Sequence, residues 1–280
     1  MSIRLRDTLM HELGELRHEP TQKRIRATLG SQTVVDSTRA LLVWEPVRVV
    51  PTYAVPEEDV DATIAPAAPD DAPTERPAGV APMGAPRLGD LRVLDPSVPF
   101  AVHTTEGEPV EVVAGDGRTA AAFRPRDPAL AGYVLLDFDA FDAWYEEDER
   151  NVGHPRDPFH RIDIVHSSRH VVVEVGGETV AESSRPCLVF EPPLPVRWYL
   201  PLADVRTELL RPSAKRSVCA YKGEASYWSV GAEEDVAWSY PEPLREAAEL
   251  AGRVAFLDER VDVVVDGIRL ERPVTPWSPR

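Results

Sequence analysis

The sequence contains few cysteines and no long apolar run. Two cysteines, Cys187 and Cys219, are too few for a disulfide scaffold or a four-cysteine zinc site. No segment approaches the roughly 18 apolar residues of a membrane-spanning helix. Residues 1–10 alternate charged and apolar side chains and lack a secretory apolar core. We therefore expect a cytoplasmic protein that contacts no membrane and holds no metal or other cofactor.

Basic residues are also scarce. Lys and Arg number 31 against 47 Asp and Glu, which gives a formal charge of −16. This excludes a nucleic-acid partner, because such proteins need a basic face. Only three basic residues are lysines: Lys23, Lys215 and Lys222. The arginine bias is typical of a GC-rich bacterial genome, and it makes each lysine a candidate for a role that needs a compact ammonium group.

Proline, in contrast, is abundant, with 28 prolines in 280 residues. This is about twice the average share, and it disfavours long helices. Short apolar runs between turn residues predict strands, with hairpin turns at Gly176-Gly177 and Asp266-Gly267. In the second half of the chain the predicted strands cover 170–175, 178–182, 187–190, 197–200, 225–230, 236–240, 254–257 and 261–265, and one helix covers 243–250.

The chain also repeats itself. Residues 37–46 match residues 183–192 at an offset of 146, with six of ten positions identical. The same offset carries Tyr53 onto Tyr199, and residues 130–134 match 250–254 at an offset of 120. The offsets differ because the first copy holds an insertion at 62–90, rich in Pro and Ala, which we expect to be a flexible loop. The matches predict a tandem duplication.

The repeat defines the predicted organisation of the chain. The fold class is mainly β, with two tandem compact antiparallel β domains and few short helices. An N-terminal helix is expected because Leu5, Leu9, Leu13 and Leu16 recur at helical spacing behind Ser2. The predicted parts are an N-terminal helix at 1–18, a first copy at 19–148, a linker at 149–166, a second copy at 167–272 and a tail at 273–280.

Two strings in the second copy carry a family resemblance. They read CAYKGEASYWSV at 219–230 and AWSYPEP at 237–243. With residues 184–191 and 198–201, they resemble family 427 of the domains of unknown function, a bacterial and fungal family that some catalogues label nucleotidyltransferase-like. The resemblance is strong over 168–270 and weaker over 22–148. It implies a compact β fold akin to the β-tent domains but free of zinc, and no established reaction.

Lys222 and Cys219 are the first candidate site residues. Lys222 offers an ammonium group that can neutralise an anion or act as a base, or it is a solvated lysine at the bend before Gly223. Cys219 lies three residues before it, and a nearby ammonium group lowers the pKa of a thiol. The alternative for Cys219 is simple packing of a small residue, and Cys187 is expected in the core.

Aromatic residues gather in the same region. Seven of the thirteen Trp and Tyr residues lie between Trp198 and Tyr240. Part of this set is needed for the core, and the remainder predicts the wall of a pocket. The aromatic candidates for a ligand site are Tyr199, Tyr221, Trp228 and Tyr240.

Two charges occur in both copies. Arg39 corresponds to Arg185, and Glu45 corresponds to Glu191. Each Arg lies six residues before its Glu, which favours a structural ion pair along a strand, and ligand recognition is the alternative. His166 and His170 are expected to be surface histidines, because no further metal-ligand motif accompanies them.

These observations predict a small-molecule-binding protein with its site in the second copy, and enzymatic activity is left open. The first copy is expected to be degenerate, because Thr52 and Val112 align with Trp198 and Trp228, and aligning Gly107 with Gly223 sets His103 opposite Cys219. The alternatives are a non-catalytic interaction module and, from the family label alone, nucleotidyl transfer, although the sequence lacks a glycine-rich phosphate loop. The predicted ligand-binding set is Arg185, Glu191, Tyr199, Cys219, Tyr221, Lys222, Trp228 and Tyr240.

Overall fold

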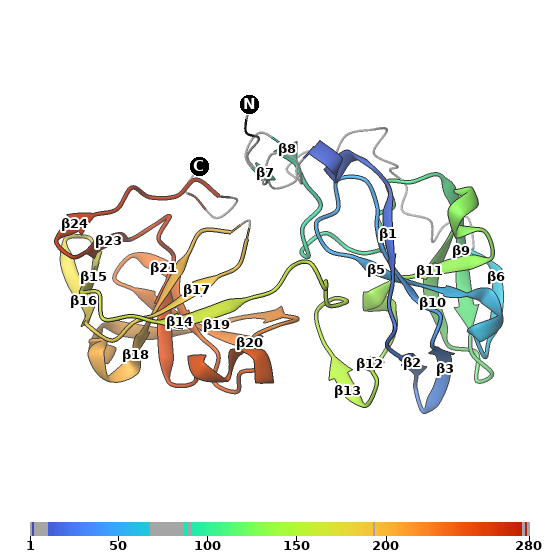
Figure 1. Ribbon diagram of the computed structural model, residues 1–280. Coiled ribbons are helices and arrows are strands. Elements are labelled where there is room, and N and C mark those ends of the chain that lie inside the picture. The colour runs from blue at the N-terminus through green and yellow to red at the C-terminus, as the bar shows by residue number, and fades with distance from the viewer. Residues whose placement is uncertain are drawn as a thin grey trace. The chain divides into compact units, whose positions relative to one another are not determined.

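The computed structural model describes residues 2, 11–67, 87–88, 91–192, 194–275 and 278. The chain divides into two compact units, which we call unit 1 (Met1–Asp157) and unit 2 (Pro158–Arg280). In Figure 1 unit 1 runs from blue to yellow-green, and unit 2 runs from yellow to red. Both units consist of antiparallel sheets with short 3-10 helices, which confirms the mainly β fold class. No described helix is long and apolar enough to cross a membrane.

Unit 2 contains a seven-stranded sheet in the order β14-β17-β18-β22-β21-β20-β19 and a four-stranded sheet in the order β16-β15-β23-β24. The positive φ angles of Gly176, Gly177, Asp266 and Gly267 mark the two predicted hairpin turns. The strands are β14 (Asp163–His166), β15 (Val171–Val175), β16 (Glu178–Ser183), β17 (Cys187–Phe190), β18 (Arg197–Pro201), β19 (Leu210–Cys219), β20 (Gly223–Val230), β21 (Glu233–Ser239), β22 (Arg253–Phe256), β23 (Asp262–Val265) and β24 (Ile268–Arg269).

Unit 1 contains a seven-stranded sheet in the order β1-β4-β5-β11-β10-β9-β6 and a four-stranded sheet in the order β13-β12-β2-β3. A further two-stranded sheet is formed by β7 (Arg87–Leu88) and β8 (Leu91–Arg92). The other strands are β1 (Arg17–Pro20), β2 (Ile25–Leu29), β3 (Gln32–Ser37), β4 (Leu41–Trp44), β5 (Thr52–Pro56), β6 (Thr63–Pro66), β9 (Gly107–Val113), β10 (Thr119–Pro125), β11 (Tyr133–Leu136), β12 (Ala143–Glu146) and β13 (Glu149–Asn151).

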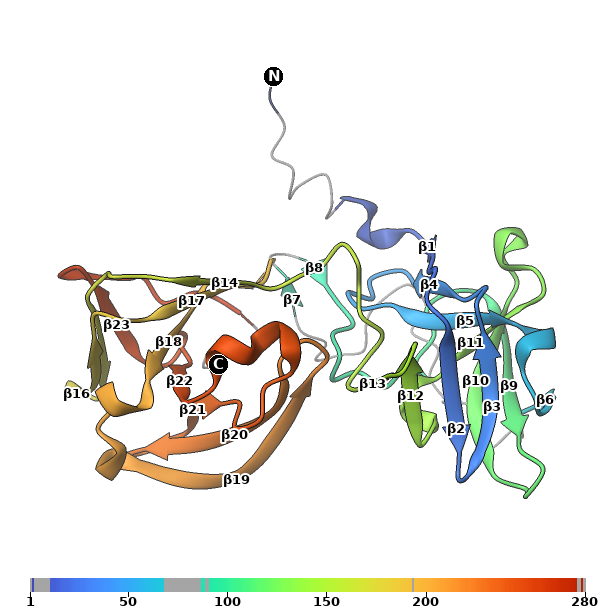
Figure 2. The ribbon, with the colours of Figure 1, turned by 60° about the horizontal axis from the view of Figure 1, so that its bottom comes forward.

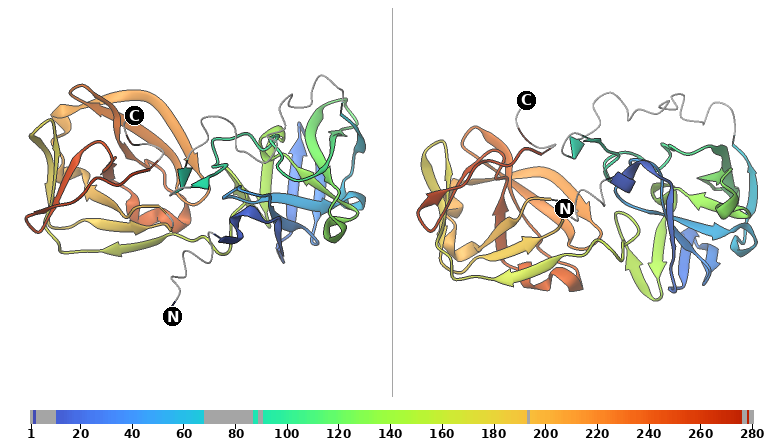
Figure 3. Two further views of the ribbon diagram at one scale, coloured as in Figure 1. Left: turned by 90° about the horizontal axis from the view of Figure 1, so that it is seen from above. Right: turned by 45° about the horizontal axis from the view of Figure 1, so that its top comes forward.

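The two units have the same strand order. β1, β4, β5, β11, β10, β9 and β6 of unit 1 take the places of β14, β17, β18, β22, β21, β20 and β19 of unit 2. In the small sheets, β2 and β3 take the places of β15 and β16. Figure 3 shows the two sheets of each unit from two further directions. The strand order therefore agrees with the repeat in the sequence.

The large sheet of unit 2 is covered on both faces. One face packs on the small sheet, in a core that joins Trp198, Leu200 and Phe256 to Val171 and Val263. The opposite face, which we call the inner face, carries a second cluster that is covered by the 3-10 helix η7 (Arg245–Leu250). Figure 2 shows η7, in orange-red, enclosed by the curl of the large sheet. The residues of the inner face are Cys187, Val189, Tyr199, Ala225, Trp238, Tyr240 and Ala255, with Ala247 and Leu250 from η7.

A serine-centred latch is repeated in both units. Ser183 Oγ donates to Asp204 at 2.6 Å and accepts the backbone N–H of Arg185 at 3.0 Å, and Arg185 binds the same carboxylate at 2.8 Å. In unit 1, Ser37, Arg39 and Asp59 make the same three contacts. Each arginine is therefore bound to an aspartate. The predicted ion pairs of Arg39 with Glu45 and of Arg185 with Glu191 are wrong.

The strand ladders correct the sequence alignment at the aromatic positions. Leu41 and Cys187 are equivalent in the repeat, and their ladder partners are Ala54 and Tyr199. Tyr53 therefore corresponds to Trp198 and not to Tyr199, and both Tyr53 and Trp198 lie in the cores between the sheets. The offset between the two copies therefore changes by one residue before β5, whereas sequence matching placed this change after Tyr53.

A second correction concerns β9 and β20. Ala122 pairs with Val110 and Leu136, and Ala237 pairs with Trp228 and Phe256. Val110 is thus the equivalent of Trp228. Counting back along both strands, Gly107 corresponds to Ala225, and Thr104 corresponds to Lys222. The sequence alignment, which sets Gly107 opposite Gly223, is therefore wrong by two residues. Along β10 and β21 the same ladders make Pro125 the equivalent of Tyr240.

Three predicted segments differ from the structure. Residues 63–66 of the expected flexible insertion form β6, because they pair with β9 in register from Thr63 opposite Val113. The rest of the insertion lies largely outside the described residues. The expected linker 149–166 contains β13 and β14. Of the expected N-terminal helix, residues 3–10 lie outside the described residues, the 3-10 turn η1 covers Glu12–Gly14, and β1 begins at Arg17.

Candidate functional site

Four elements of unit 2 bring charged and aromatic side chains to one end of the inner face. Glu191 directly follows β17, and Lys222 lies in the turn between β19 and β20. Tyr199 lies on β18, and Tyr240 directly follows β21. Gly223 has a φ of +95°, which glycine adopts without strain. This glycine lets the chain reverse immediately after Lys222.

Glu191 and Lys222 form a buried ion pair. Lys222 Nζ donates to Glu191 Oε2, and the two side chains are only 7% and 13% exposed. His160 Nε2 lies 3.7 Å from the other oxygen of Glu191. Burial opposes ionisation of this carboxyl, but Lys222 and His160 more than offset it and lower the pKa of Glu191 to about 2. Glu191 is therefore a carboxylate at physiological pH.

Lys222 also stays charged. Burial alone would lower the pKa of Lys222, but the nearby Cys219, Glu191 and Tyr199 raise it above its usual value. A lysine in this state does not act as a base at neutral pH. Its ammonium group has three N–H donors, and Glu191 is the acceptor that the described residues provide.

Two tyrosines and a thiol surround the ion pair. Tyr199 OH accepts a hydrogen bond from Trp238 Nε1 at 2.9 Å. Burial raises the pKa of both Tyr199 and Tyr240, so both hydroxyl groups stay protonated. Among the described residues, none forms a hydrogen bond with the Tyr240 hydroxyl, which lies within electrostatic reach of Cys219 and Glu191. The centre therefore holds a hydroxyl group that no described residue uses and that keeps some contact with solvent.

The structure brings together six of the eight predicted site residues. Glu191, Lys222, Tyr199, Tyr240 and Cys219 share the inner face, and the buried ring of Tyr221 lies 5.6 Å from the ring of His160. Trp228 does not belong to this group, because it packs against the core between the sheets. Arg185 does not belong either, because it is held by the latch to Asp204.

Cys187 forms a second arrangement with titratable groups in unit 2. Its Sγ lies 3.2 Å from Nδ1 of His166, and Nε2 of His166 lies 2.6 Å from Oε2 of Glu249. The order thiol, imidazole, carboxylate is that of a nucleophilic triad. The thiol, however, is fully buried, and burial raises the pKa of Cys187. These two facts keep it a protonated core residue, as the sequence indicated.

A second buried ion pair of unit 2 lies at the start of β18. Arg197 binds Glu259 through two hydrogen bonds of 2.8 and 2.6 Å, and the Glu259 carboxylate also accepts from Thr275. Asp258 lies 3.9 Å from the same guanidinium group, and burial raises the pKa of Asp258 to about 7. The bidentate geometry and the complete set of partners identify Arg197–Glu259 as a structural pair.

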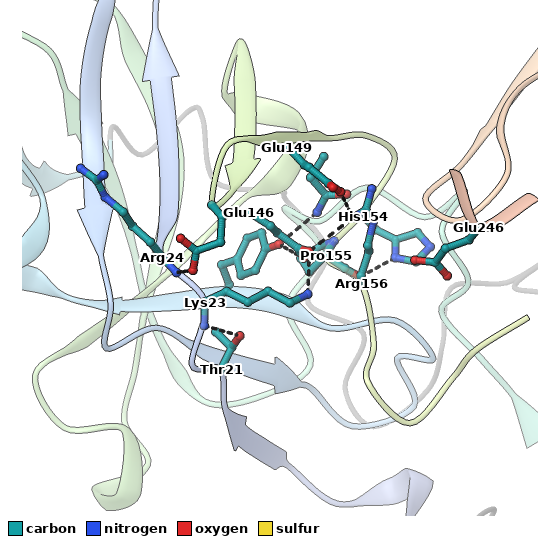
Figure 4. Close-up of polar contacts among 12 residues, drawn as sticks. Thr21, Lys23, Arg24, Glu146, Glu149, His154, Pro155, Arg156 and Glu246 are labelled. Atoms are coloured by element: carbon teal, nitrogen blue, oxygen red, sulfur yellow. Dashed lines mark hydrogen bonds and ion pairs between the residues drawn. The ribbon is translucent and has the colours of Figure 1, made fainter. Parts of the chain in front are cut away.

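The described part of unit 1 contains two buried glutamates, Glu45 and Glu146. Glu146 accepts hydrogen bonds from Tyr53 at 2.7 Å and from Lys23 at 2.6 Å. Figure 4 shows Lys23 reaching toward Glu146, with Thr21 beside it. Glu45 occupies the position of Glu191, but its partner is a histidine: Nδ1 of His103 lies 3.0 Å from Glu45 Oε2.

Sequence reasoning missed His160 and the Glu45–His103 pair. His160 lies before β14 in the expected linker, and no motif accompanies it. For Glu45 the signal was present, because the glutamate is repeated at Glu191. The alignment on glycines obscured it, since it set His103 opposite Cys219. No group of three or more His, Cys, Asp or Glu residues that could hold a metal ion occurs in the described part of the chain.

Comparison with known protein families gives one match. Residues 163–267 match the family NTP_transf_9, a domain of unknown function (DUF427). The match covers unit 2 from the first residue of β14 to the turn after β23. It includes Glu191, Lys222 and Tyr240. A search of curated proteins gave no match.

Proposed function

We propose that unit 2 binds a small molecule at the Glu191–Lys222 pair, and that this ligand carries a hydrogen-bond acceptor such as a carboxylate. The observation that carries the proposal is the Tyr240 hydroxyl: the residue is only 5% exposed, and no described residue forms a hydrogen bond with its hydroxyl beside the pair. A ligand oxygen that accepts from Tyr240 and from a remaining N–H of Lys222 would use both donors.

The difference between the two units supports this assignment. On the inner face, unit 1 has Ala54 and Pro125 where unit 2 has Tyr199 and Tyr240. Most of the remaining members of the two clusters correspond and are hydrophobic, as Leu130 and Leu250 illustrate. The fold forms without these hydroxyl groups, so their presence in unit 2 calls for a reason beyond packing.

The energetics of the ion pair point in the same direction. Taking two charges out of water costs several kcal/mol per ion, and a buried pair is often no more stable than two apolar residues of the same size. Lys222 and Glu191 therefore add little net stability to unit 2. Their burial is better explained by a ligand that uses the charges.

We also propose that unit 1 is a second, diverged copy of the domain in unit 2. The identical strand order supports this, and so does the latch of Ser37, Arg39 and Asp59, which repeats that of Ser183, Arg185 and Asp204. The backbone supports it as well, because the N–H of Asp61 binds the carbonyl of Val34 as the N–H of Arg206 binds that of Val180.

The ligand is tested by mass spectrometry of small molecules released from the purified protein. Tyr240→Phe removes one hydroxyl and keeps the ring, and Tyr145→Phe in unit 1 is its matched control. Lys222→Arg keeps the charge but not the compact geometry, with the half-exposed Lys215→Arg as control. We expect a compound that is present in the wild-type protein and both controls and is depleted in Tyr240→Phe and Lys222→Arg.

Two results would contradict the proposal. One is that no small molecule accompanies the wild-type protein at any stoichiometry. The other is that the Tyr240→Phe protein retains as much of the compound as the wild type. Thermal denaturation of each variant establishes that a loss of ligand is not a loss of fold.

A further inference from the structure

The Glu45–His103 pair of unit 1 is built with fixed orientation. Glu45 Oε1 accepts the backbone N–H groups of Thr104 and Thr105 at 3.0 and 3.1 Å, and Glu45 Oε2 lies 3.0 Å from His103 Nδ1. The ring of His103 stacks on Phe123 with a centroid distance of 4.0 Å. A carboxylate at Nδ1 favours a proton there, which leaves the lone pair of Nε2 as the free acceptor of the ring.

A second carboxylate faces this acceptor. Asp137 directly follows β11, and its side chain is 6% exposed. Its Oδ1 lies 3.6 Å from His103 Nε2, beyond hydrogen-bond distance. Among the described residues, none donates a hydrogen bond to the Asp137 carboxylate. Burial raises the pKa of Asp137 to about 6, as expected for an acid that lacks donors.

The side chains around His103 and Asp137 carry mainly negative charge. Glu45, Asp137 and the exposed Asp139 lie within electrostatic reach of one guanidinium group, that of Arg48. The N–H groups of Arg48 are taken by backbone carbonyls, which they meet at 2.7 to 3.2 Å. Arg48 therefore contributes charge but no donor to Asp137. The carbonyls belong to Val98, Pro99 and Val102.

The backbone that holds Glu45 and Arg48 is strained. Val47 lies between them with a φ of +60°, a conformation that β-branched residues avoid. Its N–H donates to Leu13 and its carbonyl accepts from Leu94, each at 2.8 Å. Such a conformation costs on the order of 1–3 kcal/mol and persists where the surrounding contacts fix it.

Unit 2 has a different residue type at the position that corresponds to Thr104. The ladders make Lys222 the equivalent of Thr104, so unit 2 places its own ammonium group beside Glu191. The hydroxyl of Thr104 donates to the carbonyl of Pro46 at 2.7 Å and is not directed to an acid. Unit 1 thus has the acids of such a centre without a lysine.

We propose that His103 Nε2 and Asp137 Oδ1 together form a second binding site, specific for a small primary ammonium ion whose nitrogen lies beside the two atoms. Two N–H groups of one ammonium nitrogen donate to the imidazole nitrogen and to the carboxylate, and the surrounding acids balance its charge. Phe123 closes one side of the imidazole, which limits the size of the substituent on the nitrogen. This site is independent of the ligand proposed for unit 2.

The test is a titration of the full chain with methylammonium chloride, followed by NMR of the His103 Cε1 proton, which is assigned from the spectrum of His103→Gln. Tetramethylammonium chloride is the control salt, because it has the same charge and no N–H. Asp137→Asn removes the charge at the same shape, and Asp61→Asn is its matched control at an exposed aspartate of unit 1.

We expect a saturable shift with methylammonium in the wild type and in Asp61→Asn, and none with tetramethylammonium. In Asp137→Asn we expect binding about tenfold weaker or more. A wild-type resonance that does not respond, that responds equally to tetramethylammonium, or that responds unchanged in Asp137→Asn overturns the proposal. If Asp137→Asn does not fold, the same titration with Asp137→Glu, which keeps the charge but moves it, decides.

Discussion

At the scale of single residues, the chemistry of unit 2 depends on a pair of charges that has little access to water. Lys222 and Glu191 are each about nine-tenths buried, and each offsets the desolvation of the other. Neither residue can be altered alone without leaving a bare charge behind. The same reasoning applies to Lys23 and Glu146 in unit 1, although Lys23 is partly exposed and water screens its charge.

The first prediction concerns Lys222→Ala. We expect this variant to lose about 3–5 kcal/mol of unfolding free energy, because it leaves the Glu191 carboxylate buried without a counter-ion. The double variant Lys222→Met with Glu191→Met should recover most of that loss. Urea denaturation of the three proteins measures both effects. A single variant as stable as the wild type would show that water reaches Glu191 freely.

The second prediction concerns pH and Asp137. The pKa of this carboxyl is raised from 3.8 to about 6 in the folded protein. A raised pKa means that the folded state binds the proton more tightly, so the contribution to stability is complete below pH 3.8 and is lost as the pH rises through 6. Asp137→Asn should therefore be more stable than the wild type at pH 8, by about 1–3 kcal/mol.

Denaturation curves at pH 5 and pH 8 check this expectation. The variant and the wild type should differ less at pH 5 than at pH 8, and Asp61→Asn should follow the wild type at both. If Asp137→Asn lowers stability at pH 8, then a donor reaches Asp137 in solution.

At the scale of elements, the serine latch fixes how β3 and β16 lead into the next strand. Ser183, at the end of β16, is buried, donates to Asp204 and accepts from the backbone of Arg185. The aspartate closes the 3-10 turn after β18, so the latch ties that turn to the small sheet. The same tie in unit 1 joins Ser37 to Asp59.

The third prediction is that Ser37→Ala and Ser183→Ala destabilise the protein by similar amounts. Each change removes two hydrogen bonds and leaves a partly buried carboxylate oxygen and a backbone N–H less satisfied, at a cost of about 1 kcal/mol. The exposed neighbour Ser184→Ala is the control and should change nothing measurable. Thermal denaturation distinguishes the three. A cost in only one unit would show that the latch is not equivalent in both.

At the scale of the whole molecule, each unit has its own cores. The clusters of unit 1 contain residues of unit 1 alone, and those of unit 2 contain residues of unit 2 alone. The division falls between Asp157 and Pro158. A unit with a closed core and a complete set of strands meets the requirements for folding alone.

The fourth prediction is that the segments 1–157 and 158–280 each fold when expressed separately. Near-ultraviolet circular dichroism reports on Trp144 in one fragment and on Trp198 and Trp238 in the other, all of which are buried. Each fragment should show a cooperative thermal transition. A fragment that unfolds non-cooperatively, or folds only when mixed with the other, would contradict the independence of the units.

The sequence predicted the local structure of unit 2 well. The strand at 187–190 has the observed bounds, and the other predicted strands lie within a few residues of the observed ones. The sequence missed three strands. β24 lies at the edge of the small sheet, and β14 and β19 lie at the edges of the large sheet. Their side chains are mostly exposed and give no alternating apolar pattern, so only pairing with β17 and β20 defines them.

Of the candidate site, the sequence by itself determined the types of residue and their repetition. It singled out Lys222 by the scarcity of lysine and Glu191 by its recurrence at Glu45. Only the tertiary structure decided which of these residues meet. Trp228 lies on the opposite face of the sheet from Tyr227 because neighbouring residues of a strand alternate in direction, and no composition reveals which face is which.

The partner of each repeated glutamate was likewise decided in three dimensions. Glu191 meets Lys222 and Glu45 meets His103, across 31 and 58 residues of chain. Such contacts depend on ladder register, and a slip of one residue turns every side chain of a strand to the other face. The sequence fixes short-range pattern because neighbouring residues share one backbone geometry, whereas buried charges find their partners only when distant strands pack together.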